Sequence, residues 1–280
     1  MLHPIQQSGG RLIPFKKAHA CGNDFLIVTE DAAAEHDWAE LTRRLCARNT
    51  GIGADGIEFF AWTGPRSGRI RLHNADGSIA EISGNGTRCV AAWMAQERGF
   101  KTGDEVEIAT DAGLRVCRIN ALKIQDEFTV EVTAGMGSPD FALKTVTLAN
   151  GQAVDGVEVS TGNPHFVIVV DTDFFTFPWR QMGTEICVHP DFPQQTNVEF
   201  VRIVSKREIE IRIFERGVGP TTSSGTGSSA SATAAIALGL AKSPLNVVAP
   251  GGAQTVEWGG AGTELKLTGP ASLIARGEAW

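Results

Sequence analysis

Two short motifs of this chain recur at nearly the same distance along the sequence. The segment Gly22–Phe25 returns, loosely, as Gly162–Phe166, with an offset of 140 positions. The segment Ser83–Gly86 returns as Ser224–Gly227, with an offset of 141. Because two independent motifs share one offset, the sequence predicts a duplicated unit of about half the chain. Two pseudo-equivalent halves predict a cleft between them, which is a usual place for a small-molecule site.

Strand patterns dominate both halves. Apolar and polar residues alternate over Arg69–His73 and again over Glu208–Ile213, as in strands with one buried face. The pattern after each Gly-x-Gly predicts a helix. The first is expected over Thr87–Arg98, with Gly99 as its C-terminal cap, and the second over Ser228–Lys242. The expected fold is therefore α+β, with two pseudo-equivalent domains that each wrap a barrel-like sheet around a central helix.

One more helix is predicted near Trp38–Arg48. Asp37 suits its N-cap, and Glu40 follows three residues later in the pattern of a capping box. Trp38, Leu41 and Leu45 give this helix an apolar stripe, so one of its faces should be buried.

Composition and net charge exclude some classes of binding partner. The chain has 280 residues, a net charge of -7 and a pI near 5.4, so neither nucleic acid nor an anionic membrane is expected as a partner. No apolar run is long enough to span a bilayer, and the start, up to Pro14, is expected to be a frayed tail without a secretory signal. Five cysteines without a CxxC spacing predict buried thiols in a reducing cytoplasm, with neither disulfides nor zinc.

A Gly-x-Gly at the start of a helix has a direct chemical use. The first helical turn leaves backbone N–H groups unpaired, and the helix dipole adds partial positive charge there, so a carboxylate can dock. One such motif alone is most simply a helix entry turn, and Ser83 and Ser224 alone are most simply N-caps. Two related copies facing one cleft instead predict a site that holds an α-carboxylate.

Six motifs, in order, resemble those of the diaminopimelate epimerase family of cofactor-independent amino-acid isomerases. The resemblance runs from about Phe15 to Trp280. It implies two similar domains, which we place at residues 11–126 plus 269–280 and at residues 127–268. It also implies that the last strand, after about Gly269, returns to the first domain. The motifs are His19–Phe25, Gly51–Gly56, Asn74–Gly77, Gly162–His165, Thr196–Phe200 and Glu215–Gly219.

The resemblance also implies roles for individual residues. The family inverts the α-carbon of LL- or meso-diaminopimelate, a precursor of lysine and peptidoglycan, with one catalytic cysteine before each Gly-x-Gly. Serine stands at both positions here. Arginine offers a planar fork to a carboxylate, and asparagine both donates and accepts hydrogen bonds. The expected catalytic positions are Ser83 and Ser224, and the expected substrate-binding residues are Asn23, Asn74, Gly84, Asn85, Asn163, Asn197, Glu215, Arg216, Gly225 and Thr226.

The two serines put the family's chemistry in question. Inversion needs a base on one face of the α-carbon and an acid on the other, and a thiol at a helix N-terminus suits both tasks. A serine hydroxyl is a much weaker acid and needs an adjacent base, which neither motif contains. The nearest histidine in sequence is His73, and it is better explained as a half-buried strand residue. Proton exchange is therefore expected to be extremely slow or absent.

Two hypotheses remain open. The chain is either a diaminopimelate epimerase whose cysteines have been replaced, or a natural two-serine homologue that binds an amino acid without epimerising it or catalyses another isomerisation or a dehydration. Departures from the family pattern at Pro220, Ser229 and Cys21 slightly favour the natural homologue. Both hypotheses predict an amino-acid ligand and no cofactor or metal, and both leave open whether the protein is a homodimer.

Overall fold

The computed structural model describes residues 12–124, 127–174 and 176–280. The first strand begins at Ile13, whose side chain is buried, so the expected frayed start is too long by at least Ile13 and Pro14. Residues 1–11 of the expected tail lie outside the described residues.

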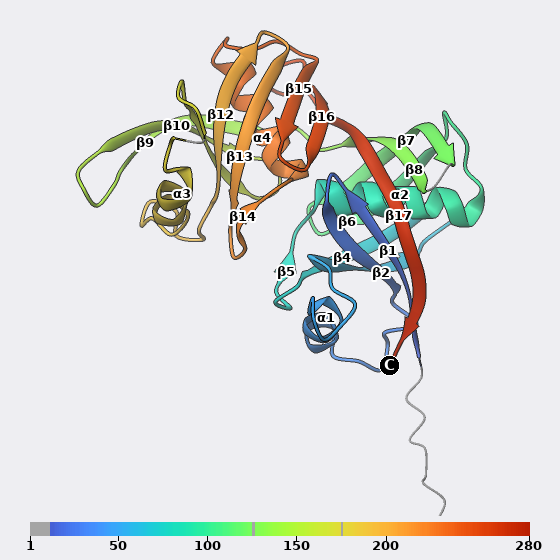
Figure 1. The fold of residues 1–280 in the computed structure, drawn as a ribbon. Coiled ribbons are helices and arrows are strands. Elements are labelled where there is room, and N and C mark those ends of the chain that lie inside the picture. The colour runs from blue at the N-terminus through green and yellow to red at the C-terminus, as the bar shows by residue number, and fades with distance from the viewer. Residues whose placement is uncertain (1–11, 125–126, 175) are drawn as a thin grey trace, which may run out of the picture.

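Eight strands close a barrel in the first half of the molecule. Going round, the order is β1, β2, β3, β4, β6, β7, β8 and β17, and β17 pairs again with β1. Helix α2 fills the barrel (Figure 1), and its residues from Cys89 to Ala95 are buried. The bounds are β1 (Ile13–Ala20), β2 (Asn23–Thr29), β3 (Gly56–Trp62), β4 (Ser67–Asn74), β5 (Ile79–Ala80), α2 (Gly84–Arg98), β6 (Glu105–Thr110), β7 (Gly113–Ile124), β8 (Phe128–Gly135) and β17 (Lys266–Ala279).

The second half repeats this plan around α4. Its strands pair in the order β9, β10, β11, β12, β13, β15 and β16, and β16 then pairs with the start of β17. The bounds are β9 (Asp140–Thr147), β10 (Ala153–Ser160), β11 (Pro164–Val169), β12 (Asn197–Ser205), β13 (Glu208–Glu215), β14 (Gly219–Thr221), α4 (Gly225–Ala237), β15 (Leu245–Ala249) and β16 (Gly252–Glu257). The two-domain α+β fold expected from the repeat is confirmed.

Two outer helices extend the repeat. Helix α1 (Trp38–Cys46) connects the parallel strands β2 and β3, and α3 (Trp179–Cys187) connects the parallel strands β11 and β12. The first and last residues of these helices correspond at an offset of 141. As predicted, Asp37 caps α1 by accepting a hydrogen bond from the Glu40 backbone at 2.9 Å. The helix ends at Cys46, two residues before the expected end.

The central helices meet at their N-termini. A Cβ atom added to Gly225 would lie only 2.8 Å from Gly84 Cα, so the two helix starts are in backbone contact. Both helices begin three residues earlier than expected, at Gly84 and Gly225. The glycines of each Gly-x-Gly form the first helical turn, and Gly84 and Gly225 make the contact between the two helices. Helix α4 also ends early, at Ala237, since the chain reaches a positive φ at Gly239.

The last strand joins the two halves. In Figure 1, β17 runs from beside β16 past α2 to the side of β1, and residues Ser272 to Ala279 pair with β1 as expected. Strand β8 pairs with β7 and β17, and its Val130 and Val132 are buried in the core cluster that contains α2. The division of the chain at residue 127 remains a prediction, and these contacts favour a boundary after Gly135.

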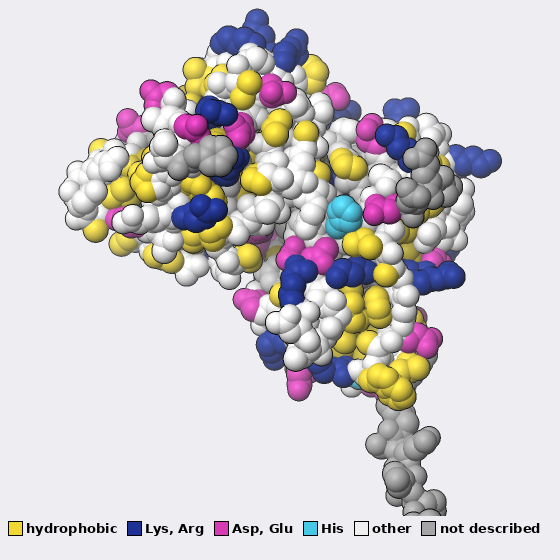
Figure 2. Space-filling view, in the orientation of Figure 1, with side chains coloured by type: hydrophobic (Ala, Val, Ile, Leu, Met, Phe, Trp, Pro, Cys, Tyr) yellow, Lys and Arg dark blue, Asp and Glu magenta, His cyan; other side chains and the backbone are white. Residues whose placement is uncertain are grey.

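The surface carries charges of both signs, and the cysteines are buried as predicted. Basic and acidic side chains are interspersed over the face shown in Figure 2. All five cysteines are buried and free of disulfides. Over the described part of the chain, no helix is long and apolar enough to cross a membrane.

Candidate active site between the two helix N-termini

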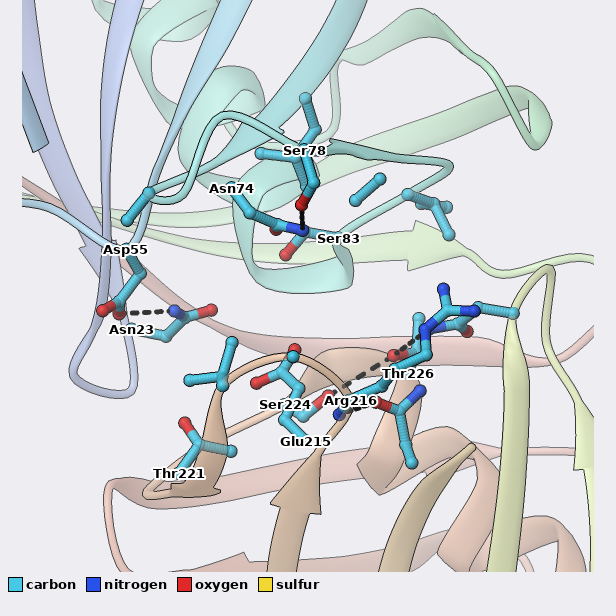
Figure 3. A pocket seen from close by; sticks show the side chains of 18 of the residues that line it. Asn23, Asp55, Asn74, Ser78, Ser83, Glu215, Arg216, Thr221, Ser224 and Thr226 are labelled. Atoms are coloured by element: carbon cyan, nitrogen blue, oxygen red, sulfur yellow. Dashed lines mark hydrogen bonds between the residues drawn. The ribbon is translucent and has the colours of Figure 1, made fainter. Parts of the chain in front are cut away.

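A cleft of about 520 Å³ opens where the two halves face each other. Figure 3 shows Ser83 on one side of this cleft and Ser224 on the other. Nine of the twelve expected site residues line it. They are Asn23, Asn74, Ser83, Asn163, Asn197, Glu215, Arg216, Ser224 and Thr226.

Each serine caps one central helix. Ser83 Oγ accepts a hydrogen bond from the Gly86 backbone at 3.0 Å, and Ser224 Oγ accepts one from Gly227 at 3.1 Å. Both hydroxyls therefore lie beside the unpaired N–H groups and positive dipole ends of buried helices. A negatively charged group between the two serines would be stabilised by both helices.

The asparagines are held by a hydrogen-bond network. Asn23 Nδ2 donates to the Asp55 carboxylate at 2.6 Å, and Asn197 Nδ2 donates to the Pro164 carbonyl at 2.9 Å. Asn197 Oδ1 also accepts from the Arg216 backbone at 2.9 Å. Asn74 Nδ2 donates to Ser78 Oγ at 3.1 Å. These fixed partners orient the amide groups before any ligand arrives.

Arg216 spans the cleft from the second half to the first. It lies in the turn between β13 and β14, and its guanidinium is 3.5 Å from the carboxylate of Glu81, which precedes α2. The same guanidinium donates to the Gln194 carbonyl at 3.1 Å. Beside it, burial together with the charges of Asp55 and Glu199 raises the pKa of Glu215 to about 7. The cleft thus offers a cation and a titratable acid at one end.

Three expected binding residues lie behind the wall of the cleft. Gly84 and Gly225 form the contact between the helices. The Asn85 side chain is fully buried, and its Nδ2 donates to Asn23 Oδ1 at 3.0 Å and to Ser223 Oγ at 3.1 Å. Asn85 thus positions Asn23, and direct contact of these three residues with a substrate remains a prediction.

Several cleft residues were missed by the sequence analysis. Asp55 belongs to the Gly51–Gly56 motif, and Glu81 lies between the motifs Asn74–Gly77 and Ser83–Gly86, but neither was assigned to the site. A second omission is a pair of buried carboxyl groups, Glu58 and Glu199, one under each helix start. Glu199 accepts from His165 Nδ1 at 2.8 Å, whereas Glu58 has no hydrogen-bond partner among the described residues.

His73 does not reach the cleft. It is buried on β4, with its ring at 5.3 Å from that of Phe59 and edge-on to it. Burial lowers the pKa of His73, which keeps the ring neutral. Its role as a strand residue rather than a proton carrier is therefore favoured. Across the described residues, no cluster of three or more histidine, cysteine or acidic side chains could hold a metal ion.

The sequence profile of the diaminopimelate epimerase family matches residues 15–142 and 157–274. A diaminopimelate epimerase from Desulfitobacterium hafniense is 35% identical over 93% of this chain and 96% of its own length. One from Desulforudis audaxviator is 37% identical over 94% of this chain and 98% of its own length. The chain belongs to the diaminopimelate epimerase family. By this resemblance it is an isomerase of the amino-acid epimerase type.

Solved structures show the same fold at low sequence identity. A hydroxyproline epimerase from Agrobacterium vitis matches with a TM-score of 0.70 at 16% identity, covering 96% of this chain and 91% of the other. A phenazine biosynthesis protein of the PhzF family from Bacillus anthracis matches with a TM-score of 0.71 at 16% identity, covering 97% of this chain and 100% of the other. The two-domain fold of the diaminopimelate epimerase family is thus shared by proteins with different names.

Proposed function

We propose that this protein inverts the α-carbon of diaminopimelate without a cofactor, with Ser83 and Ser224 acting on opposite faces. The observation that carries the proposal is the meeting of two capped helix N-termini at one cleft. As in the family it resembles, the reaction would supply lysine and peptidoglycan synthesis in the cytoplasm. The serines make it slower than a thiol-based reaction.

The helix starts suit the reacting end of the substrate. Its α-carboxylate would accept hydrogen bonds from backbone N–H groups of the first turns, where the dipoles add positive charge. Loss of the α-proton spreads negative charge into that carboxylate, so the same groups bind the transition state more tightly than the ground state. The α-carbon then lies between the two serine hydroxyls.

The other end of the cleft suits a second amino-acid head group. Arg216 would exchange its ion pair with Glu81 for the distal carboxylate of the ligand. Glu215 would face the distal ammonium, whose positive charge stabilises the ionised carboxyl and lowers its pKa from about 7. The asparagines would read both groups, since each amide donates and accepts.

Calorimetry with a small ligand panel tests the binding half of this proposal. Diaminopimelate should bind at least about tenfold more tightly than lysine, which lacks the distal carboxylate that Arg216 would hold. Pimelate, which lacks both amino groups, is the matched control for the asparagines and Glu215. Equal affinities for diaminopimelate and lysine would contradict the assignment of Arg216.

A second candidate is a two-serine homologue that binds the amino acid without epimerising it, or catalyses another isomerisation or a dehydration. It is favoured by one observation, since each hydroxyl already serves as a helix cap. Such a protein would pass the calorimetric test but would leave the α-proton of diaminopimelate in place.

A further inference from the structure

Glu58 is a buried ionisable group that its packing does not explain. It lies on β3 with its side chain fully buried, and neither carboxyl oxygen has a hydrogen-bond partner among the described residues. Its cross-strand neighbours are the apolar Ile27 and Leu72. Buried carboxyl groups are rarely left unpaired, because burial without a partner costs several kcal/mol. An apolar residue at position 58 would fill the same space without this cost.

The carboxyl group lies directly behind the cap of α2. A Cβ atom added to Gly86 would be 1.9 Å from Glu58 Oε1 and 3.2 Å from Ser83 Cβ. The distance between Glu58 Oε1 and Ser83 Cβ therefore cannot exceed the sum of these two distances. The Gly86 backbone also donates to Ser83 Oγ at 3.0 Å. Glu58 thus lies close to the serine in the protein interior and does not line the cleft.

The second half repeats the arrangement with one difference. Glu199 lies 141 positions after Glu58 and has the same neighbours in its own half. A Cβ atom added to Gly227 would be 2.8 Å from Glu199 Oε1 and 3.1 Å from Ser224 Cβ. Glu199 is paired with His165, whereas the residue that corresponds to His165 in the first half is Phe25. One carboxyl group therefore has a hydrogen-bond partner, and the other faces apolar side chains.

This difference gives the two carboxyl groups unlike surroundings. Burial raises the pKa of Glu58 to about 8, so it is mostly protonated at neutral pH. On α2, the Cys89 thiol is buried and lies within reach of the charge of Glu58. Its pKa is raised, chiefly by burial and further by Glu58. In the second half, the His165 ring lies between Glu199 Oε1 at 2.8 Å and Asn163 Oδ1 at 2.9 Å. Inversion needs an acid on one face and a base on the other, and a protonated Glu58 behind Ser83 would supply the acid.

We propose that Glu58 is the proton reservoir of Ser83 and acts through it, in the reaction assigned above. Glu58 makes no hydrogen bond to Ser83 Oγ in the structure, so its carboxyl group must first turn toward the serine. When the α-carbon takes up a proton from the Ser83 hydroxyl, Glu58 then transfers its own proton to Ser83 Oγ and becomes a carboxylate. On the opposite face the leaving α-proton passes to Ser224 Oγ, while the Ser224 hydroxyl proton passes to the hydrogen-bonded pair of Glu199 and His165. Neither serine carries a charge after the step. The reverse direction exchanges the two roles.

Exchange of the α-proton at different pH values tests this role. In the wild type, exchange should fall as pH rises through about 8, because the protonated form of Glu58 is lost. Glu58→Gln and Glu58→Leu should both slow exchange by about tenfold or more at neutral pH and abolish this pH dependence. Affinity for diaminopimelate should be unchanged, since Glu58 does not line the cleft. Variants that keep the wild-type rate and pH dependence would overturn the proposal.

A second measurement needs no substrate and separates this proposal from the function on which it rests. Ser83→Cys introduces a thiol into the cleft while all native thiols are buried, so iodoacetamide should report its ionisation. Ionised Glu58 opposes ionisation of that thiol, so the pH midpoint of alkylation should fall by about one unit in Ser83→Cys with Glu58→Gln. The control variant combines Ser83→Cys with Glu81→Gln, which removes a more exposed carboxylate that lines the same cleft. An unchanged midpoint with Glu58→Gln would overturn the coupling, even if no substrate were found.

Discussion

Replacing both Ser83 and Ser224 by cysteine is expected to raise the rate of α-proton exchange on diaminopimelate by about 100-fold or more. A thiol has an unperturbed pKa of about 8.5, and a helix N-terminus lowers it further, whereas a serine hydroxyl stays far from the working range. Both serines accept a hydrogen bond within the first helical turn, which is where a thiolate would be stabilised. Either single replacement should gain much less, because inversion uses both faces.

Proton NMR in heavy water measures this exchange, and Ser78→Cys supplies the matched control. Ser78 lines the same cleft but lies in the turn between β4 and β5, away from a helix start. It should therefore add a thiol without accelerating exchange. A folded double-cysteine variant that binds diaminopimelate but exchanges its α-proton no faster than the wild type would show that the site has diverged beyond these two atoms.

The Arg216→Ala substitution should weaken diaminopimelate binding by about 2–5 kcal/mol. The guanidinium side chain is only 26% exposed, so its loss leaves a ligand carboxylate partly buried without a cation. Titration calorimetry on the two proteins measures the difference directly. Arg202→Ala is a suitable control because Arg202 is also partly buried and paired, with Glu210, but does not line the cleft. Equal affinities of wild type and Arg216→Ala would remove Arg216 from the binding site.

The repeat made the fold predictable from the sequence. Two motifs at one offset indicated two equivalent halves, and the Gly-x-Gly segments correctly located both central helices. Their starts were placed three residues late because glycine is a poor helix former and was taken as part of the entry turn. The serine caps already indicated the true starts. The contact between Gly84 and Gly225 explains the glycines, and it belongs to tertiary structure that no local pattern shows.

The site was predictable where a residue belonged to a recognised motif. The cleft-lining asparagines and Arg216 were found in this way, while the burial of Asn85 depends on packing between the halves. Glu58 was missed although a signal was present. The sequence from Ile57 to Phe59 reads Ile-Glu-Phe, and 141 positions later Val198 to Phe200 reads Val-Glu-Phe. A lone acidic residue in a strand usually faces solvent, so only the structure showed that β3 is covered on both faces, by α2 and by α1.

The central claim is that Ser83 and Ser224 exchange a proton with opposite faces of one α-carbon. The most direct test is to incubate LL-diaminopimelate with the wild-type protein in heavy water and to follow both deuterium at the α-carbon and the appearance of the meso isomer. The account predicts slow incorporation accompanied by inversion, abolished by Ser83→Ala and by Ser224→Ala. Tight binding with no incorporation, or incorporation that survives either alanine substitution, would contradict it.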